Sequence, residues 1–125
     1  DRDTVALVAC DGHRVIGFAM MQFGEERAHL ALLAVRPPYR RRGVARRLVD
    51  WLIESAKVAG IASVHLELRE SNEAAKRFYR AVGFSDTVLV PGYYLGKEAA
   101  LRMLRVLRQP GTIPFSWRPP RLDPH

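Results

Sequence analysis

The chain has 125 residues, 48% of them hydrophobic and 26% charged, which is typical of one globular domain with a single core. Its 20 Lys and Arg residues outnumber 13 Asp and Glu residues, and the net charge of +7 favours an anionic cofactor or a nucleic acid as ligand. No apolar run approaches the ~18 residues that span a membrane. The single Cys10 excludes an internal disulfide and fits a reducing compartment, so we expect a cytoplasmic protein without a membrane partner.

The first third of the chain predicts three β-strands. Residues 4–10 are apolar and partly β-branched, and Asp11-Gly12 marks a hairpin turn into a return strand over residues 15–22. Residues 28–35 form an almost continuous apolar run. Because strands buried on both faces have such runs, we expect the third strand to be covered on both sides.

The middle of the chain predicts two helices separated by a strand. Apolar residues recur at helical spacing over residues 44–56, and Gly60 follows where a C-terminal cap belongs. Residues 63–68 alternate between apolar and polar, as expected of a half-buried strand. A second helix is expected over about residues 72–82, with Ser71 or Asn72 as its N-cap and Gly83 after its end.

The last part of the chain predicts a hairpin and a tail. Residues 84–90 and 99–107 read as two strands around a turn at 91–94, although residues 98–108 also suit a helix. Five of the eight prolines follow residue 108, so residues 109–125 are expected to be an extended basic tail beside a domain of residues 1–108. The element order predicts an α/β fold with a mixed sheet, in which ligands bind beyond the carboxyl ends of the strands.

A basic, glycine-containing segment follows the third predicted strand. Arg40, Arg41, Arg42 and Gly43 stand where that strand hands over to the first helix. Glycine lets a backbone approach a ligand, a helix start presents unpaired N–H groups, and arginine adds fork-shaped donors for phosphate. The segment therefore predicts a site for a phosphorylated small molecule. The glycine patterns of P-loops and of dinucleotide-binding folds are absent from the sequence.

A carboxylate, an amide and a phenol stand close together in the second half of the sequence. Glu67 ends a predicted strand, and Asn72 and Tyr79 are seven residues apart on the helix that follows, which places them on one face. These groups can line a cleft beside the phosphate segment. The spacing alone favours the alternative that these residues form no site: Tyr79 would pack in the core, Asn72 would only cap the helix and Glu67 would be solvated.

Two other classes of site find little support. One cysteine and four separated histidines give no metal-ligand spacing, so we expect no metal. A nucleic-acid-binding module would interleave aromatic residues with the arginines, but only Tyr39 lies near them, and no reader motif is present.

Together the two segments resemble the paired motifs of the GNAT family of N-acetyltransferases. The resemblance covers roughly residues 5–107 and is strongest over residues 66–84, which, with Tyr93-Tyr94, look most like the bacterial enzymes that acetylate the N-terminal alanine of a ribosomal protein. The motifs are Arg40-x-x-Gly43-x-Ala45 and Asn72-x-x-Ala75-x-x-x-Tyr79-x-x-x-Gly83-Phe84.

The resemblance implies a mixed, mainly antiparallel sheet flanked by helices, and an enzyme that transfers an acetyl group from acetyl-CoA to a primary amine. It implies that Glu67 is the general base and Tyr79 the general acid, and that Asn72 bonds the cofactor near its reacting end. Backbone groups on the third strand would bind the pantetheine arm, and the segment after it would wrap the pyrophosphate. These cofactor-binding residues are Leu33, Ala34, Val35, Arg40, Arg41, Arg42, Gly43, Val44, Ala45 and Arg46.

The acceptor is expected to be a protein N-terminus, because an α-amine loses its proton more easily than lysine and Tyr93-Tyr94 is placed to narrow a groove. A small-molecule amine, a lysine side chain and a basic nucleic-acid-binding module remain alternatives. Members of the family usually carry a further strand and one or two helices before the hairpin that begins at Thr4. We expect these elements to be absent from this sequence, either because they were cut away or because another subunit, as in a homodimer, supplies the cover.

Overall fold

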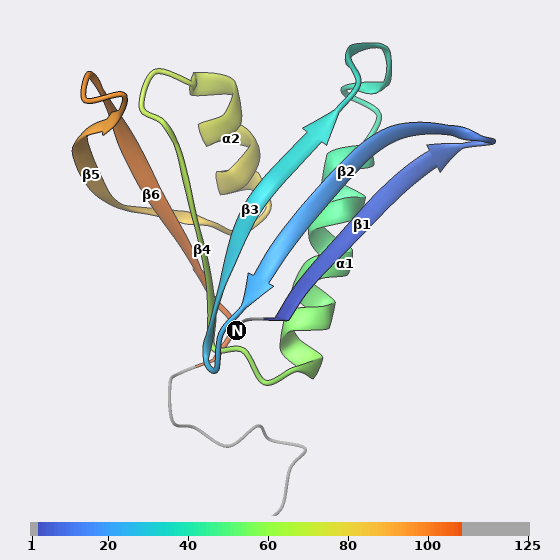
Figure 1. Cartoon of the computed structure of the whole chain (residues 1–125), viewed down its shortest axis with the longest axis horizontal. Coiled ribbons are helices and arrows are strands. Elements are labelled where there is room, and N and C mark those ends of the chain that lie inside the picture. The colour runs from blue at the N-terminus through green and yellow to red at the C-terminus, as the bar shows by residue number, and fades with distance from the viewer. Residues whose placement is uncertain (1–2, 109–125) are drawn as a thin grey trace, which may run out of the picture.

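The computed structural model describes residues 3–108, so the expected tail at 109–125 lies outside the described residues. Within this range the chain forms a sheet and helices in the order shown in Figure 1. The elements are β1 (Asp3–Asp11), β2 (Arg14–Phe23), β3 (Arg27–Val35), the short 3-10 helix η1 (Pro37–Tyr39), α1 (Val44–Val58), β4 (Ser63–Arg69), α2 (Glu73–Ala81), β5 (Ser85–Tyr94) and β6 (Glu98–Val106). No helix in this range is long and apolar enough to cross a membrane.

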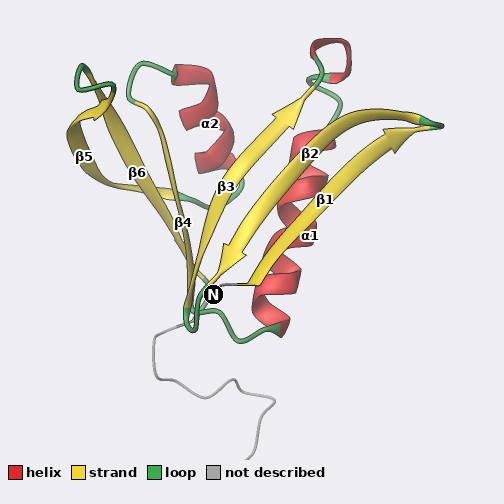
Figure 2. Cartoon of the chain, viewed as in Figure 1, coloured by secondary structure: helices red, strands yellow, loops and turns green. Residues whose placement is uncertain are grey.

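The strands form one mixed, mainly antiparallel sheet in the order β1-β2-β3-β4-β6-β5 (Figure 2). Every neighbouring pair is antiparallel except β3 and β4, which are parallel. The α/β fold class predicted from the sequence is therefore confirmed. The parallel pair lies in the middle of the strand order, and a helix follows each of its two strands.

The two parallel strands pair only at their amino ends. Arg27–His29 lies opposite Ser63–His65, and beyond that point β3 and β4 diverge, as Figure 1 shows. The carboxyl-terminal half of β3 therefore keeps its pairing with β2 but has no paired strand on its β4 side among the described residues. Backbone N–H and C=O groups are strong hydrogen-bonding groups, so this open edge is suited to an extended ligand.

Both helices pack on one face of the sheet, where the core lies. Alternate strand residues such as Met21, Val64 and Met103 are fully buried there. They pack with the apolar stripe of α1, whose buried residues are Leu48, Val49, Leu52, Ile53 and Ala56. Fully burying a side chain of this kind contributes about 1.5–3 kcal/mol. The hydrophobic contacts between this face and the helices therefore stabilise the fold.

The opposite face has no covering helix in the described part of the chain. On β1, β2 and β3 it exposes Val8, Phe18 and Leu32, which are 56%, 41% and 48% accessible. The prediction that the third strand is buried on both faces was therefore wrong. Ala28, Leu30, Leu33 and Val35 pack toward the core, but Leu32 and Ala34 are exposed.

The C-terminal segment also differs from one of its predictions. Residues 98–106 form β6, and the helical alternative is excluded because β6 pairs with β4 on one side and β5 on the other. The turn was expected at residues 91–94, but these belong to β5, and the chain turns at residues 95–97. Pro91 fits within an edge strand because the register shifts between Val90 and Tyr94.

Each helix ends in the motif that its following glycine predicts. After α1, the Gly60 N–H donates to the Lys57 carbonyl at 3.0 Å and the Ile61 N–H to the Ala56 carbonyl at 2.9 Å. Gly60 has a φ of 82°, in the left-handed region that favours glycine. Gly83 closes α2 with the same pair of bonds. These turns fix where each helix stops and the next strand begins.

Candidate active site

The loop before α1 has the geometry of an anion site. Gly43 is the N-cap of α1 with a φ of 80°, and Arg41 also has a positive φ, of 64°. No side chain caps the helix start, and its first turn holds no acidic residue. The N–H groups of Val44, Ala45 and Arg46 therefore point out of a free helix start with its positive dipole end. A Cβ built on Gly43 would meet nothing within 4 Å, so the space above the backbone is open.

The arginines around this loop are exposed, and they differ in what they contact. The Arg40 Nε donates to the Val35 carbonyl at 3.0 Å, which ties the loop to the end of β3. The Arg42 guanidinium lies 5.5 Å from the Tyr39 ring centroid. Arg46 lies on the first turn of α1, 4.0 Å from Asp50. The predicted cationic rim is therefore present around the helix start.

The predicted pantetheine-binding residues lie on the open edge of the sheet. Leu33, Ala34 and Val35 occupy the end of β3, beyond its last pair with β4. In register with β2, Val35 lies opposite Gly17, and Ala34 lies opposite Phe18. The Arg40 contact occupies the Val35 carbonyl in this structure, so a ligand strand there would compete with that side chain or share the oxygen.

Glu67 lies at the centre of a hydrogen-bonded cluster on the helix-free face. Its side chain is only 8% exposed, and both oxygens are used. Oε1 accepts from His29 Nε2 at 2.9 Å, and Oε2 accepts from Arg102 Nε at 2.8 Å. Burial raises the pKa of Glu67, but the bonds from Arg102 and His29 outweigh it and hold the pKa below its ordinary value. The carboxylate is therefore ionised at neutral pH.

Two histidines complete this cluster, and sequence spacing did not reveal them. The rings of His29 and His65 are stacked with centroids 4.7 Å apart, and their ligand atoms and those of Glu67 lie within 4.8 Å of one another. The histidines were expected to be too far apart to share a metal ion, and for His29 and His65 this was wrong. Arg102 already holds Glu67, and its positive charge disfavours a metal cation at the cluster.

Burial lowers the pKa of His65, and the neighbouring His29, Arg102 and Arg27 lower it further against the opposing effect of Glu67. Neutral His65 is therefore favoured at neutral pH. The histidines and Arg102 belong to the cluster because β3, β4 and β6 are neighbours, with Glu67 in register opposite Arg102 and His29 opposite His65. In the sequence, the one sign of this cluster was the alternation of residues 63–68, which places His65 and Glu67 on the same face of the strand.

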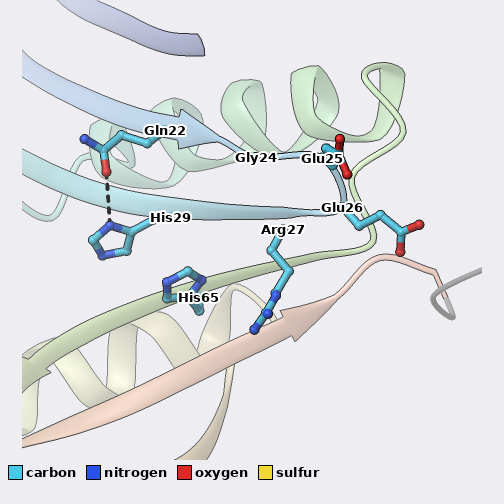
Figure 3. Close-up of a pocket in the computed structure, with 7 residues that line it drawn as sticks. All are labelled: Gln22, Gly24, Glu25, Glu26, Arg27, His29 and His65. Atoms are coloured by element: carbon cyan, nitrogen blue, oxygen red, sulfur yellow. Dashed lines mark hydrogen bonds between the residues drawn. The ribbon is translucent and has the colours of Figure 1, made fainter. Parts of the chain in front are cut away.

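A cavity of about 560 Å³ adjoins the histidine pair. Figure 3 shows His29 on β3 and His65 on β4 next to each other, with Gln22 beside His29, and both histidines line the cavity. His29 Nδ1 lies 3.4 Å from Gln22 Oε1. The remaining lining residues come from the turn between β2 and β3 and the start of β3: Gly24, Glu25, Glu26 and Arg27.

Asn72 and Tyr79 lie at opposite ends of α2. Asn72 is the N-cap, and its Oδ1 accepts from the Ala75 N–H at 3.1 Å, which confirms the capping prediction. Tyr79 packs against the core and makes edge contacts with the rings of Phe78 and Phe84. Burial raises the pKa of Tyr79 to about 12, so its phenol stays protonated at neutral pH. Tyr79 thus lies on the helix side of the sheet, whereas Glu67 lies on the helix-free face.

The tyrosine pair lies near the hairpin end, where Arg69 holds it. The Arg69 guanidinium lies 4.4 Å from the Tyr94 ring centroid and donates to Glu98 at 2.9 Å. Tyr93 packs edge-on against Tyr94 and stays 46% exposed. Glu98 also accepts from the hydroxyl of Ser71, just before α2. The β5–β6 hairpin is thereby fastened to the connection between β4 and α2.

Comparison with known proteins identifies the family. Residues 1–84 match the family model described as Acetyltransferase (GNAT) family, and the chain belongs to this family. It is 36% identical over 93 residues to the ribosomal protein bS18-alanine N-acetyltransferase of Escherichia coli, which covers 72% of this chain. The matched region is 63% of that relative, so the chain spans less than two thirds of the length of the curated relatives it matches.

Solved structures agree with this assignment. The crystal structure of the ribosomal-protein-alanine N-acetyltransferase from Escherichia coli superposes with a TM-score of 0.79 at 31% identity, covering 86% of this chain and 72% of that one. A chain in the structure of the NatC complex, bound to Gag peptide and CoA, superposes with a TM-score of 0.74 at 26% identity, covering 82% and 70%. The sheet and both helices therefore follow the GNAT fold.

Proposed function

We propose that this chain is the catalytic part of an acetyl-CoA-dependent N-acetyltransferase that acts on protein N-termini. The observation that carries the proposal is that an uncapped helix start follows one of two adjacent parallel strands, and the hydrogen-bonded Glu67 carboxylate lies on the other. The start of α1 follows β3, and Glu67 lies on β4, two residues past the last β3–β4 pair. The carboxyl ends of these parallel strands point to the same end of the sheet, where the strands diverge, and ligands of α/β folds bind beyond such strand ends.

The cofactor would lie along the open edge of β3 with its pyrophosphate at α1. Leu33, Ala34 and Val35 would offer backbone groups to the amide-containing pantetheine arm. The free N–H groups after Gly43 and the neighbouring arginines Arg40, Arg41, Arg42 and Arg46 would bind the phosphates. The CoA in the NatC structure and the family assignment support acetyl-CoA as this anion.

Asn72 would complete cofactor binding at the start of α2. Its Oδ1 is used by the Ala75 N–H, but no hydrogen bond is recorded for its side-chain NH₂ among residues 3–108. An amide nitrogen carries two donors, and it would lie beside the reacting end of a cofactor threaded between β3 and β4. Its proposed partner is a carbonyl of the pantetheine arm.

The two sides of the sheet would take different parts of the reaction. Glu67 and its histidines lie on the helix-free face, where the acceptor amine would arrive, and Tyr79 lies on the helix side, where the thiol would leave. A phenol with a pKa of about 12 gives up its proton to a thiolate of pKa ~8.5 only at a cost of about 5 kcal/mol. Tyr79 is therefore better suited to donating a hydrogen bond to the departing sulfur than to transferring its proton.

An α-amine fits this site better than a lysine. An α-amino group has a pKa of ~7.7–8.0 and a lysine ~10.4, so neutralising lysine costs about 3.5 kcal/mol more at ~1.36 kcal/mol per unit. The Glu67 carboxylate is a weak base because its pKa is lowered. The E. coli relative at 36% identity is named for an alanine in a ribosomal protein, which supports a protein acceptor. Cytoplasmic location and a homodimer remain predictions.

The test uses three peptides of matched length with acetyl-CoA, and follows release of the CoA thiol. One peptide has a free Ala N-terminus and no Lys, the second a blocked N-terminus and an internal Lys, and the third has neither amine. We expect turnover with the first alone. Faster acetylation of the lysine peptide would refute the N-terminal assignment and keep the acetyltransferase. No turnover with any peptide, while polyamines are acetylated, would point to a small-molecule acceptor.

A further inference from the structure

Glu67 is poorly placed to take a proton directly from an incoming amine. Its two oxygens are occupied by His29 and Arg102, and only 8% of the side chain is exposed. Each oxygen keeps a second lone pair, but the low exposure of the side chain leaves an amine little access to it. The imidazole of His29 is 31% exposed and lines the adjoining cavity, so it stands between the carboxylate and the accessible space.

We propose that His29 is the group that accepts the proton of the acceptor amine, and that Glu67 is its positioning residue. The inference rests on the proposed function and refines one step of it. An ionised carboxylate can only accept hydrogen bonds, so His29 must donate to Glu67 through Nε2–H. In the neutral ring this leaves the lone pair on Nδ1, on the edge that faces Gln22 and the cavity (Figure 3).

Gln22 can serve both protonation states of His29. With Oε1 toward Nδ1 at 3.4 Å, as in the structure, the amide accepts a weak hydrogen bond from the charged ring. Turned by 180°, the same amide presents its NH₂ group to the neutral ring, because an amide carries a donor and an acceptor on the same carbon. The amine, or a water, takes the place of Gln22 at Nδ1 when the proton is transferred, and Gln22 Oε1 then accepts from the charged ring.

Charged groups of both signs face the histidine pair. Glu67 is the anion that stabilises a charged His29, whereas Arg102 on β6 and Arg27 on β3 add positive charge. His65 is stacked directly on His29, and burial together with this neighbour favours its neutral form. From β2 the neutral Gln22 lies against the ring, and Glu25 and Glu26 of the turn between β2 and β3 line the same cavity. Glu67 therefore places its negative charge against the ring of His29.

The proposed step conserves atoms and charge. The neutral amine nitrogen attacks the thioester carbonyl carbon, the C–N bond forms and the C–S bond breaks. The proton lost by the nitrogen goes to His29 Nδ1, directly or through one water. The sulfur leaves as a thiolate, hydrogen-bonded by the Tyr79 hydroxyl, and takes a proton from solvent. His29 then returns its proton to solvent, which restores the enzyme.

The experiment compares wild type with His29→Gln, because the glutamine NH₂ can still donate to Glu67 but cannot take a proton. His13→Gln is the matched control, since His13 lies exposed in the turn between β1 and β2. Calorimetry with acetyl-CoA and thermal melting show whether each variant is folded. We expect His29→Gln to lower kcat by about 10²–10⁴-fold, the range for general acid–base catalysis, with acetyl-CoA affinity retained. His13→Gln should match wild type.

The pH dependence separates His29 from the acceptor, whose amine also titrates. The kcat profile is recorded with two peptides whose α-amines differ in pKa. Wild type should show an acid limb that stays fixed between the peptides and coincides with the His29 signal in an NMR titration, which needs no activity. His29→Gln should lose this limb, and Glu67→Gln should shift the NMR midpoint to lower pH, because the imidazolium loses its anion.

Wild-type kcat and an unchanged acid limb in His29→Gln would overturn this inference and leave the acetyltransferase standing. An NMR midpoint unaffected by Glu67→Gln would overturn the positioning role. If wild type itself acetylates no amine, the proposed function fails and the proton-transfer step falls with it. A misfolded His29→Gln is recognised by melting, and in that case the coincidence of the kinetic limb with the His29 NMR titration in wild type decides the question.

Discussion

Replacing Gly43 by alanine tests the proposed cofactor loop, and the chain supplies a matched control in Gly60. Gly43 begins α1 and Gly60 follows its end, with φ values of 80° and 82°. At both positions a Cβ would meet nothing within 4 Å. Holding an alanine in the left-handed region costs about 1–2 kcal/mol, so Gly43→Ala and Gly60→Ala should lose similar stability. A loss of that size lowers the melting temperature of a domain of this length by roughly 4–8 °C per kcal/mol.

The two variants should differ in acetyl-CoA binding. At Gly43 the new methyl group enters the open space over the helix start, where the pyrophosphate would receive charge-assisted hydrogen bonds worth about 1.5–3 kcal/mol each. Losing even one of these weakens binding by at least about tenfold, since 1.4 kcal/mol corresponds to a factor of ten. Urea melts would measure the matched stability loss, and isothermal titration calorimetry the affinity. Equal acetyl-CoA affinity in Gly43→Ala and Gly60→Ala would refute the placement of the phosphates.

Two further substitutions test the two sides of the sheet. Tyr79→Phe keeps the ring contacts but removes the proposed hydrogen bond to the developing thiolate, which is worth about 1.5–3 kcal/mol. Steady-state assays should therefore show kcat reduced by roughly 10–150-fold, with acetyl-CoA affinity unchanged. A wild-type kcat in this variant would mean that Tyr79 only packs in the core. Arg102→Leu should destabilise the fold by about 1–2 kcal/mol at pH 7, at the low end for a bond to a charged group because Arg102 is 42% exposed. Because the pKa of Glu67 is lowered in the folded state, the stability that the Arg102–Glu67 bond supplies is present above the ordinary pKa of ~4.3 and is lost as pH falls through the folded-state pKa. Urea melts should therefore show a smaller destabilisation by Arg102→Leu at pH 3 than at pH 7. An equal destabilisation at both pH values would contradict this prediction.

Local sequence patterns determined most of the secondary structure. The order of strands and helices, the Asn72 cap and the glycines that end both helices were all predictable, because each depends on neighbours within a few residues. The proposed phosphate loop was recognisable for the same reason, since Arg41, Arg42 and Gly43 are consecutive residues of one turn. Arg41 and Gly43 have positive φ values in that loop, and its binding of phosphate stays a prediction.

Residues 98–106 show where local patterns stop. Their sequence suits a helix as well as a strand, and pairing with β4 and β5 decides for the strand. Likewise Leu32 is apolar but exposed, because which face a helix covers is settled only when the sheet is assembled. The turn after β5 moved to residues 95–97 because an edge strand can accommodate Pro91 at a shift in register.

The residues around Glu67 were decided by tertiary structure alone. Glu67 stands out in the sequence, but His29 lies 38 residues before it and Arg102 lies 35 residues after it. Nothing in their local sequence marks them, since they meet only because β3, β4 and β6 are neighbours in one sheet. The sequence by itself determined most of the elements and marked the loop before α1 as the proposed anion site. The tertiary structure decided which donors hold the carboxylate, because hydrogen bonds between side chains depend on strand order and register.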